Sequence, residues 1–465
     1  MAMTDIESHK ADLRIVQEQV RSFFAVRTEI KIYHGSSNST RAFKFEKSKF
    51  VDISKLNRVI EINTQGQFVL VEPNVPMDLL VEQTLKYGLI PPVVPEFPGI
   101  TVGGGIQGGA EESASFKYGL LHDCCLEYEV ILGNGELISA SREKNPDLFW
   151  GIAGSYGSLG VITLVKLKLI PAKDFVHLTY HTVKSFQEAV SLIKQKSSEP
   201  VNFIDGIMFS KYFGVVMIGS FSDSQKLPVS TFSKPNDEWF YLHAKKLSKN
   251  NFKYEELVPI RDYIFRYNRG AFWMGRYGFS IFKIPFIKFT RLILNGLFNT
   301  RVLYRLLRET NLSQLYFIQD FNLPSEKVLD FFDFAEKQLE IYPVWICPLK
   351  PGLEDKLSAN YIKTDLVFNI GLWGEVQKDF KSFVKLNRLL EVKSSELKGR
   401  KMLYAHSYYP PEEFWKVYDL EWYNSLRKKY SATVTFPDIY EKTLVSEKYK
   451  TSILKGVLKV IKLYF

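Results

Sequence analysis

Residues 91–113 read PPVVPEFPGITVGGGIQGGAEES. Prolines stiffen the first half of this segment and supply no backbone N–H donors. Glycines in the second half allow the chain to bend sharply or to lie against a flat group. The side chains are too small to build a core, whereas glycine amides can point together at phosphate or carbonyl oxygens. The segment therefore predicts a binding cradle.

The glycines at 103, 105 and 108 also fit the G-x-G-x-x-G pattern of a Rossmann dinucleotide site. That fingerprint requires a strand before the glycines and a helix after them. Here prolines precede them, and residues 111–119 contain two serines and a further glycine. We therefore reject a Rossmann site and retain the cradle.

Composition bounds the possible partners. A chain of 465 residues predicts two or three domains, and a hydrophobic content of 46% is enough for sizeable cores. The net charge of +10 suits anionic cofactors, anionic lipid surfaces or nucleic acid. The basic residues are spread along the sequence, without the dense basic run and interleaved aromatic residues that bind single strands. Nucleic acid is therefore not an expected partner.

The cysteines and the first residues indicate the compartment. Cys124, Cys125 and Cys347 form neither a disulfide framework nor a C-x-x-C pair, so we expect a reducing compartment and no metal site. The first ten residues are polar, and no run reaches about 18 apolar residues. The sequence therefore predicts no signal peptide and no transmembrane helix.

Hydrophobic spacing predicts the local structure of the N-terminal third. Apolar residues recur at helical intervals over 5–25 and 75–87. Gly133-Asn134-Gly135 separates two β-like runs and predicts a hairpin, because Asn and Gly tolerate the positive φ of such turns. A second glycine-rich segment occupies 151–163. Strands are expected at 30–33, 68–73, 126–132, 136–141 and 161–170.

Residues 34–41 read HGSSNSTR and follow the first expected strand. Three serines, Asn and Thr give this tight turn many hydroxyl and amide donors, which suits an anionic ligand. An ordinary polar loop has the same composition, so the residues alone leave both interpretations open.

These donor-rich turns match a known pattern. Residues 34–39, 100–105, 147–150 and 157–163 resemble the pyrophosphate loop, the cofactor-lining segment and the pocket-closing segment of the FAD-binding domain in the vanillyl-alcohol oxidase / p-cresol methylhydroxylase (PCMH) superfamily. Within it, the sequence resembles the delta(24)-sterol reductases. This likeness extends over nearly the whole sequence, at 111–120, 169–173, 319–321, 342–348, 402–405, 412–415 and 436–440. Those reductases carry an N-terminal membrane helix, which is not expected here, and commonly a His where this sequence has Phe116.

The resemblance implies an α+β fold with two main domains. A two-part PCMH-type FAD-binding domain is expected at 1–175, and an antiparallel-sheet substrate (cap) domain at 176–400. Residues 401–465 are expected to return to the FAD-binding domain. In the middle region, strand-like runs at 209–210, 214–220, 315–323 and 366–372 alternate with helical patterns at 185–196, 325–341 and 377–391. That alternation is typical of an antiparallel sheet with helices on one side.

The implied cofactors are FAD and, as reductant, NADPH. The serine-rich turn can donate to the pyrophosphate, and glycines allow the backbone to approach the flavin closely. His34, Cys124 and Cys125 are the nearby candidates for a covalent link, and we expect non-covalent binding instead. The expected FAD-binding residues are His34, Gly35, Ser36, Ser37, Asn38, Ser39, Thr101, Val102, Gly103, Gly104, Gly105, Gln107, Gly108, Gly109, Glu112, Ser113, Gly157, Gly160, Val161 and Ile162.

Three residues are candidates for catalysis. The resemblance places the strand around 316–321 against the flavin, where Asp320 can orient the substrate or relay a proton; a structural strand-end carboxylate is the alternative. Tyr404 and His406 are two residues apart, so on a strand they share a face. Either can protonate a carbon atom, although a lone His is more often structural.

Two further residues are candidates for the substrate pocket. Trp345 and Cys347 are also two residues apart and are expected to line an apolar pocket. A Trp is more often part of a protein core, so this interpretation stays open.

Two amphipathic segments suggest contact with a membrane. Residues 272–289 are strongly aromatic and include Arg276, Lys283 and Lys288, in the cap where a lipid substrate would enter. The C-terminal segment 451–465 has an apolar stripe flanked by lysines, the pattern of an interfacial helix; a helix docked on the protein core is the alternative. The stripe consists of Ile453, Leu454, Val457, Leu458, Ile461 and Phe465, and the lysines are Lys455, Lys459 and Lys462. We expect peripheral association with the cytoplasmic side of a membrane.

The function implied by the resemblance is an FAD-dependent oxidoreductase that uses NADPH to reduce a carbon–carbon double bond in the aliphatic tail of a sterol-like lipid. Reduced flavin would supply the hydride and a protein acid the proton. An FAD-dependent oxidase or dehydrogenase of an alcohol or polyol, with the same fold, is the enzymatic alternative. A peripheral membrane-binding protein with a vestigial flavin fold is the non-enzymatic one.

Overall fold

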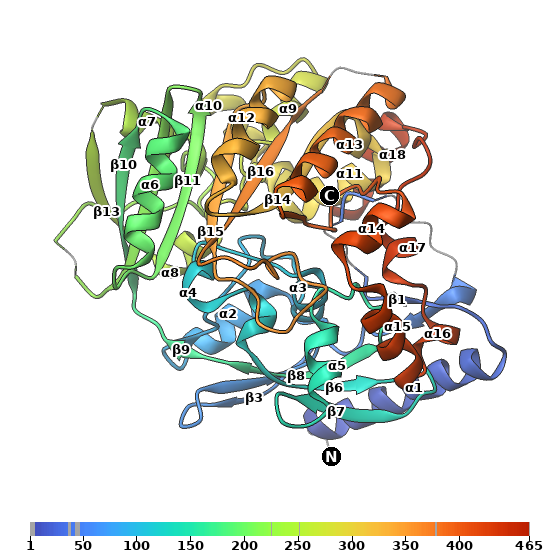
Figure 1. The fold of residues 1–465 in the computed structure, drawn as a ribbon. Coiled ribbons are helices and arrows are strands. Elements are labelled where there is room, and N and C mark those ends of the chain that lie inside the picture. Colours follow the sequence, from blue (N-terminus) through green and yellow to red (C-terminus); the bar gives the residue numbers. More distant parts are fainter. Residues whose placement is uncertain are drawn as a thin grey trace.

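The structure, a computed structural model, describes residues 5–35, 39–41, 47–224, 226–250, 252–376 and 379–464. Two sheets organise it: a five-stranded sheet in the lower, blue-to-cyan part of Figure 1 and an eight-stranded sheet above it. Neighbouring strands in both sheets run antiparallel. This arrangement confirms the predicted α+β class.

The smaller sheet forms the base of the N-terminal part, with strand order β3-β4-β8-β6-β7. Its β6–β7 hairpin turns at Gly135, whose φ is +79°, as the Gly-Asn-Gly signal predicted. Two helices on this sheet, α2 (Met77–Leu85) and α3 (Val102–Gly108), share one hydrophobic core with it. The strands are β3 Val59–Asn63, β4 Phe68–Val71, β8 Val161–Lys168, β6 Cys125–Ile131 and β7 Leu137–Ser141.

A smaller lobe precedes this sheet. Helix α1 (Asp5–Ala25) lies against a parallel pair, β1 (Lys31–Tyr33) and β2 (Phe50–Asp52). The buried face of α1 carries Leu13, Val16 and Val20, spaced as the helical pattern requires. The remaining short elements of the N-terminal part are β5 Leu89–Ile90, α4 Ser115–Tyr118, α5 Pro146–Ile152 and β9 Ile170–Pro171.

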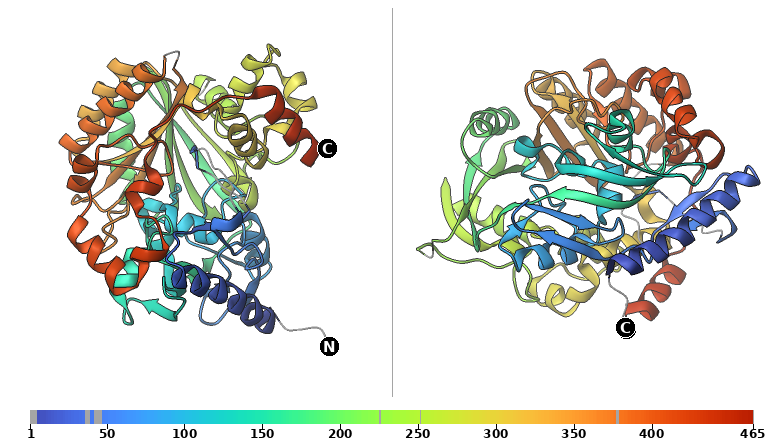
Figure 2. Two further views of the ribbon diagram at one scale, coloured as in Figure 1. Left: turned by 90° about the vertical axis from the view of Figure 1, so that its right-hand side faces the viewer. Right: turned by 90° about the horizontal axis from the view of Figure 1, so that it is seen from below.

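The larger sheet has the strand order β13-β10-β12-β11-β15-β16-β14-β17. Helices α6 (Phe186–Ser197), α12 (Val328–Leu339) and α13 (Phe380–Glu396) cover one face, and the opposite face looks toward the N-terminal part (Figure 2, left). The predicted strands and helices of the middle region are all present, and β11, β12 and β16 are longer than expected. The strands are β10 Phe175–Val183, β11 Phe203–Ser210, β12 Phe213–Ser222, β13 Lys253–Pro259, β14 Tyr316–Pro324, β15 Val344–Leu349, β16 Val367–Glu375 and β17 Arg400–Lys401.

A helical segment lies between β13 and β14, on the side of the sheet that faces the N-terminal part. Its helices are α8 Ile260–Ile264, α9 Gly275–Ile281, α10 Lys288–Ile293 and α11 Thr300–Thr310; α7, Phe240–Asn250, precedes β13. The backbone then returns to the N-terminal part through α14 Pro411–Val417, α15 Leu420–Lys429, α16 Ala432–Thr435 and α17 Ile439–Thr443, red in Figure 1. Lys429 pairs with Asp147 at 2.6 Å, and the Thr435 hydroxyl donates to the Gly133 carbonyl at 2.7 Å.

The last helix, α18 (Ile453–Tyr464), packs on α11. Among its described residues Gly456 and Val460 are buried, and a Cβ on Gly456 would lie 2.7 Å from the Glu309 carbonyl oxygen of α11. The helix thus packs through residues that lie outside the predicted apolar stripe. Ile453, Leu454 and Leu458 of that stripe are exposed. Phe465 and the side chain of Ile461 lie outside the described residues. Over the described part of the sequence, every helix is too short or too polar to cross a bilayer.

Candidate active site

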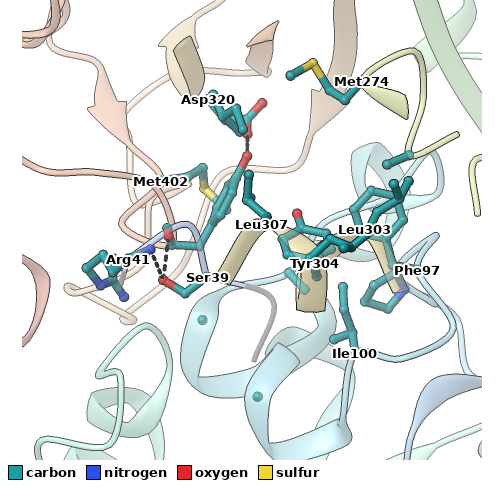
Figure 3. A pocket seen from close by; sticks show the side chains of 18 of the residues that line it. Ser39, Arg41, Phe97, Ile100, Met274, Leu303, Tyr304, Leu307, Asp320 and Met402 are labelled. Carbon is teal, nitrogen blue, oxygen red and sulfur yellow. Dashed lines mark hydrogen bonds between the residues drawn. The ribbon is translucent and has the colours of Figure 1, made fainter. Parts of the chain in front are cut away.

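A cavity of about 760 Å³ lies between helix α3 and the larger sheet (Figure 3). This volume is within the range of ligand pockets, about 300–1,000 Å³. Its walls come from residues 31–34, 39–41 and 95–111, from β14 with 402–404, and from helices α9, α11 and α18. The N-terminal part, the larger sheet, the helical segment and the C-terminal segment therefore all contribute residues to the cavity wall.

The glycine segment is a short helix and not the cradle of converging amides that we predicted. The Thr101 hydroxyl caps this helix by accepting from the Gly104 amide at 3.3 Å. The other amides also donate inside the protein: Val102 to Val75, Gly103 to Pro73 and Gly105 to Thr101, at 2.8–2.9 Å. A ligand at this wall consequently meets a flat glycine surface, with these amides already engaged.

Gly103, Gly104 and Gly105 have different structural roles. A Cβ on Gly103 would lie 2.7 Å from the Pro73 Cβ, and one on Gly105 would lie 2.7 Å from Leu121 Cδ2, so both allow the helix to pack closely. A Cβ on Gly104 would meet only the Thr101 hydroxyl, at 2.9 Å, because this residue is exposed to the cavity. Gly104 is therefore the glycine that a flat ring can approach.

One end of the cavity is cationic. Lys31, Arg41 and Lys442 line it, together with His34, which is neutral because burial lowers its pKa to about 4. Burial, with Lys31 and Arg41 nearby, lowers the pKa of Lys442 to about 7. Ser39 and Arg41 lie together at the lower left of Figure 3, and Ser36, Ser37 and Asn38 fall outside the described residues. Crowded positive charge of this kind suits an anionic group such as a diphosphate.

Another end of the cavity is acidic. Glu96, Glu111 and Asp320 line it, and burial raises the pKa of Glu96 to about 8 and that of Asp320 to about 7. Burial together with the Asp320 and Glu96 charges also raises the pKa of Glu111. Because these carboxyls disfavour one another's ionisation, this end can hold protons at neutral pH.

Asp320 has two side-chain donors. It accepts one hydrogen bond from the Tyr404 hydroxyl and one from Trp373 Nε1 at 3.3 Å. Burial and the Asp320 charge raise the pKa of Tyr404 well above its usual value, so the phenol stays protonated. Tyr316 and Ile318 also line the cavity, so alternate residues of β14 face it.

The prediction that His406 shares a face with Tyr404 is wrong. Residues 402–406 form a turn and not a strand, so the two side chains diverge. His406 Nε2 lies 3.0 Å from the Thr40 carbonyl oxygen, and the residue is not part of the cavity wall. Burial and Lys401 lower the pKa of His406 to about 3, which keeps it neutral. It is a poor proton donor in this position.

The comparisons with known proteins agree with this geometry. A family model described as an FAD binding domain matches residues 16–141. The delta(24)-sterol reductase of Homo sapiens is 29% identical over 459 residues, 93% of this protein and 86% of the human one. The protein is a homologue of the delta(24)-sterol reductases. The Arabidopsis thaliana enzyme is 29% identical, with 89% of this protein and 79% of the plant one aligned, and the Caenorhabditis elegans homologue is 28% identical, with 94% and 87% aligned.

Not all predicted residues of this sterol reductase homologue reach the cavity. The residues that line it are His34, Ser39, Thr101, Gly103, Gly104, Gly105, Gln107, Gly108, Val161, Ile162, Asp320, Trp345 and Tyr404. The predicted residues absent from its described wall are Gly35, Val102, Gly109, Glu112, Ser113, Gly157, Gly160, Cys347 and His406. Cys347 is covered because its Sγ contacts the Glu112 carbonyl oxygen at 3.4 Å. Val102 and Gly160 face the core, where a Cβ on Gly160 would meet Val130 at 2.6 Å.

Glu112 belongs to a buried ion network instead of the cofactor wall. Its carboxylate pairs with Arg266 at 2.9 Å and accepts from the Ser113 hydroxyl at 2.6 Å. Arg266 also pairs with Asp205 of β11 at 3.1 Å, so the network joins the 111–113 segment to the larger sheet. Its neighbour Glu111 is the carboxylate that faces the cavity.

Removing Glu112 should therefore lower stability more than cofactor affinity. Glu112→Ala leaves Arg266 buried with one partner fewer, and breaking such a pair costs about 3–5 kcal/mol. Denaturant unfolding of the variant should show this loss, while FAD affinity measured by flavin fluorescence stays near that of the wild type. A stable variant with weakened FAD binding would contradict the placement.

Sequence reasoning missed several residues of the wall. The most important are Lys31, Arg41, Glu96, Glu111, Tyr156, Phe272, Tyr304, Trp373 and Lys442. A signal existed for two of them: Arg41 ends the serine-rich turn, and Glu96 lies inside the proline-glycine segment. Lys442 comes from α17, far away in sequence, and only the fold brings it there.

Lys442 allows a test of the cationic end. If it binds an FAD phosphate as an ammonium, Lys442→Gln should weaken FAD binding about tenfold. In the wild type, FAD affinity should fall as the pH rises above about 7, because the free lysine has then lost its proton. Titration of apoprotein with FAD from pH 6 to 9 checks both, with the exposed Lys448→Gln as the matched control. Equal affinities and pH profiles in both variants would remove Lys442 from the site.

Proposed function

We propose that the protein is an FAD-dependent oxidoreductase that uses NADPH to reduce a carbon–carbon double bond in the aliphatic tail of a sterol-like lipid. The observation that carries this proposal is one cavity with three successive environments. A cationic end and a glycine surface suit FAD, the Asp320–Tyr404 pair suits proton delivery, and an aromatic wall suits an apolar substrate. Relatives that align over most of their length are named delta(24)-sterol reductases.

The residues present fit FAD. Gly104 offers the ring a surface without a Cβ, and Ser39, Arg41 and Lys442 surround the place for the diphosphate. Val161 and Ile162, at the start of β8, complete the wall of the FAD-binding part. When bound and reduced by NADPH, FAD supplies a hydride.

The proton is proposed to come from Asp320 through Tyr404. Loss of a proton from the Tyr404 hydroxyl would leave a phenolate beside a carboxylate, which the raised pKa of Tyr404 opposes. A protonated Asp320 removes this obstacle, since it can give its proton to Tyr404 as Tyr404 gives its own to the substrate carbon. The raised pKa of Asp320 keeps this proton available near neutral pH.

The cap side of the cavity suits a large apolar molecule. Phe97, Ile100, Leu303 and Tyr304 group on the right of Figure 3, away from Ser39 and Arg41. Phe97 contacts Phe272 and Tyr304 with ring centroids 5.8 and 5.7 Å apart. This mainly apolar wall suits an aliphatic tail better than a polyol.

The proposed domains are those expected from the sequence: FAD-binding at 1–175, cap at 176–400, and a returning segment at 401–465. We also propose that the protein associates peripherally with the cytoplasmic side of a membrane. The exposed Leu454 (75%) and Leu458 (51%) of α18 support this location.

The function can be tested on purified protein. We expect a yellow protein whose flavin absorbance is bleached anaerobically by NADPH, and cells that accumulate a sterol with an unreduced tail when the gene is deleted. Hydrogen peroxide release with an alcohol or polyol would indicate the oxidase instead. A colourless protein that fails to bind added FAD would indicate the vestigial fold.

A further inference from the structure

The cavity opens on one side of the cap, beside helices α9 and α18. Phe282, Ile453 and Val457 line the cavity at this place. Phe282 and Ile453 are also exposed on the outer surface, by 49% and 38%. Apolar residues therefore continue from the cavity wall to the surface.

Exposed apolar side chains gather around this opening. In the two views of Figure 2, the red helix α18 lies beside the yellow helices that follow β13, at one side of the molecule. Soluble surfaces rarely collect so many large apolar side chains without a partner. We call this surface the portal face; it consists of Phe282, Ile287, Phe289, Leu292, Ile293, Leu454, Leu458 and Leu463.

The two segments that form the portal face carry basic residues only, and Arg291 of α10 pairs with Glu238 from outside them. Neither 263–308 nor 451–465 contains an Asp or Glu. Lys283, Lys288, Lys455 and Lys462 are exposed there. The neighbouring Lys459 is different, because it pairs with Glu309 at 2.7 Å. Apolar side chains interspersed with lysines are complementary to an anionic bilayer, which offers both a hydrocarbon layer and negative headgroups.

We infer that the portal face docks on an anionic phospholipid bilayer, and that the sterol-like lipid passes from the bilayer directly into the cavity beside Phe282 and Ile453. The identity of this lipid rests on the proposed function. The docking itself rests on the exposed side chains and their charge. The surface involves the loop and helix at 282–293 as much as α18, so the C-terminal helix is only part of the membrane contact.

The protein offers a matched pair of variants to test the docking. Phe289 on α10 is 66% exposed, and Phe252, just before β13, is 71% exposed. Sedimentation with vesicles of phosphatidylcholine, with or without phosphatidylserine, measures binding of the full-length holoprotein. We expect wild type and Phe252→Asp to bind the phosphatidylserine vesicles alike. Phe289→Asp/Ile293→Asp should bind at least about tenfold more weakly, because it carries charge into the apolar layer.

Turnover measured with sterol in detergent micelles and with sterol in vesicles tests the docking separately from the proposed function. The Phe289→Asp/Ile293→Asp variant should keep its flavin spectrum, its melting temperature and its activity on sterol in detergent micelles. It should lose activity on sterol in vesicles. Vesicle binding without turnover in either format would contradict the proposed function and leave the docking intact.

Three results would overturn the docking. The first is that wild-type protein reduces the sterol in micelles but fails to bind phosphatidylserine vesicles. Equal loss of binding in Phe252→Asp is the second, since it shows that the position is irrelevant. The third is that the wild type is a dimer in analytical ultracentrifugation and the portal-face variant is a monomer. The surface would then bind a second copy of this protein.

Discussion

Gly104→Trp should produce a folded protein that purifies without flavin. Gly104 is the glycine of α3 whose missing side chain opens to the cavity, whereas those of Gly103 and Gly105 face Pro73 and Leu121. An indole at this position fills the surface where the flavin ring would lie. We expect the flavin content to fall on the order of 100-fold, measured as absorbance near the flavin band per protein.

The control for this variant is Leu126→Trp. Leu126 lies on β6 and is 39% exposed, outside the cavity wall, so this tryptophan should leave the flavin content unchanged. Apoprotein of Gly104→Trp should unfold at the temperature of wild-type apoprotein. A Gly104→Trp protein with wild-type flavin content would mean that FAD binds elsewhere.

Removal of either Asp320 or Tyr404 should have the second large effect, a loss of turnover. Asp320→Asn and Tyr404→Phe each keep the side-chain size and remove one member of the proposed relay. We expect flavin binding to persist in both and turnover of the alkene to fall on the order of 100-fold, the usual scale for a lost acid–base group. Tyr316→Phe, on the same cavity wall, and the exposed Asp330→Asn are the matched controls.

The pH dependence separates a proton donor from a structural residue. Burial raises the pKa of Asp320 to about 7, and the proposed reaction needs its protonated form. Turnover should therefore be maximal below about pH 7 and fall as the pH rises through that value. The fall should be absent in Asp320→Asn. An unchanged pH profile in that variant, or wild-type turnover in both variants, would exclude the relay.

Local pattern predicted the regular elements well. The hairpin at Gly133-Asn134-Gly135 and the amphipathic helix at 5–25 follow from turn chemistry and periodicity, which involve near neighbours in sequence. The resemblance to a family supplied what these patterns lack, namely that β14 faces the site and brings Asp320 to it.

The errors arose where tertiary contacts decide the structure. Three consecutive glycines disfavour a helix, yet α3 forms because Thr101 caps it and Gly103 and Gly105 permit close packing on Pro73 and Leu121. His406 turned away because residues 402–406 do not continue a strand. For α18 the sequence left docking on the protein core open, and only the fold shows that Gly456 packs against α11. None of these contacts is visible as a periodicity.

The most direct test is anaerobic reoxidation of the reduced protein by the substrate. Protein reduced with one equivalent of deuterated NADPH would be mixed with a sterol whose tail carries a double bond, and flavin absorbance followed by stopped flow. We predict that the oxidised flavin spectrum returns without oxygen and that the saturated product carries one deuterium in its tail. Flavin that stays reduced until oxygen is admitted, with the sterol double bond intact, would contradict the proposed function.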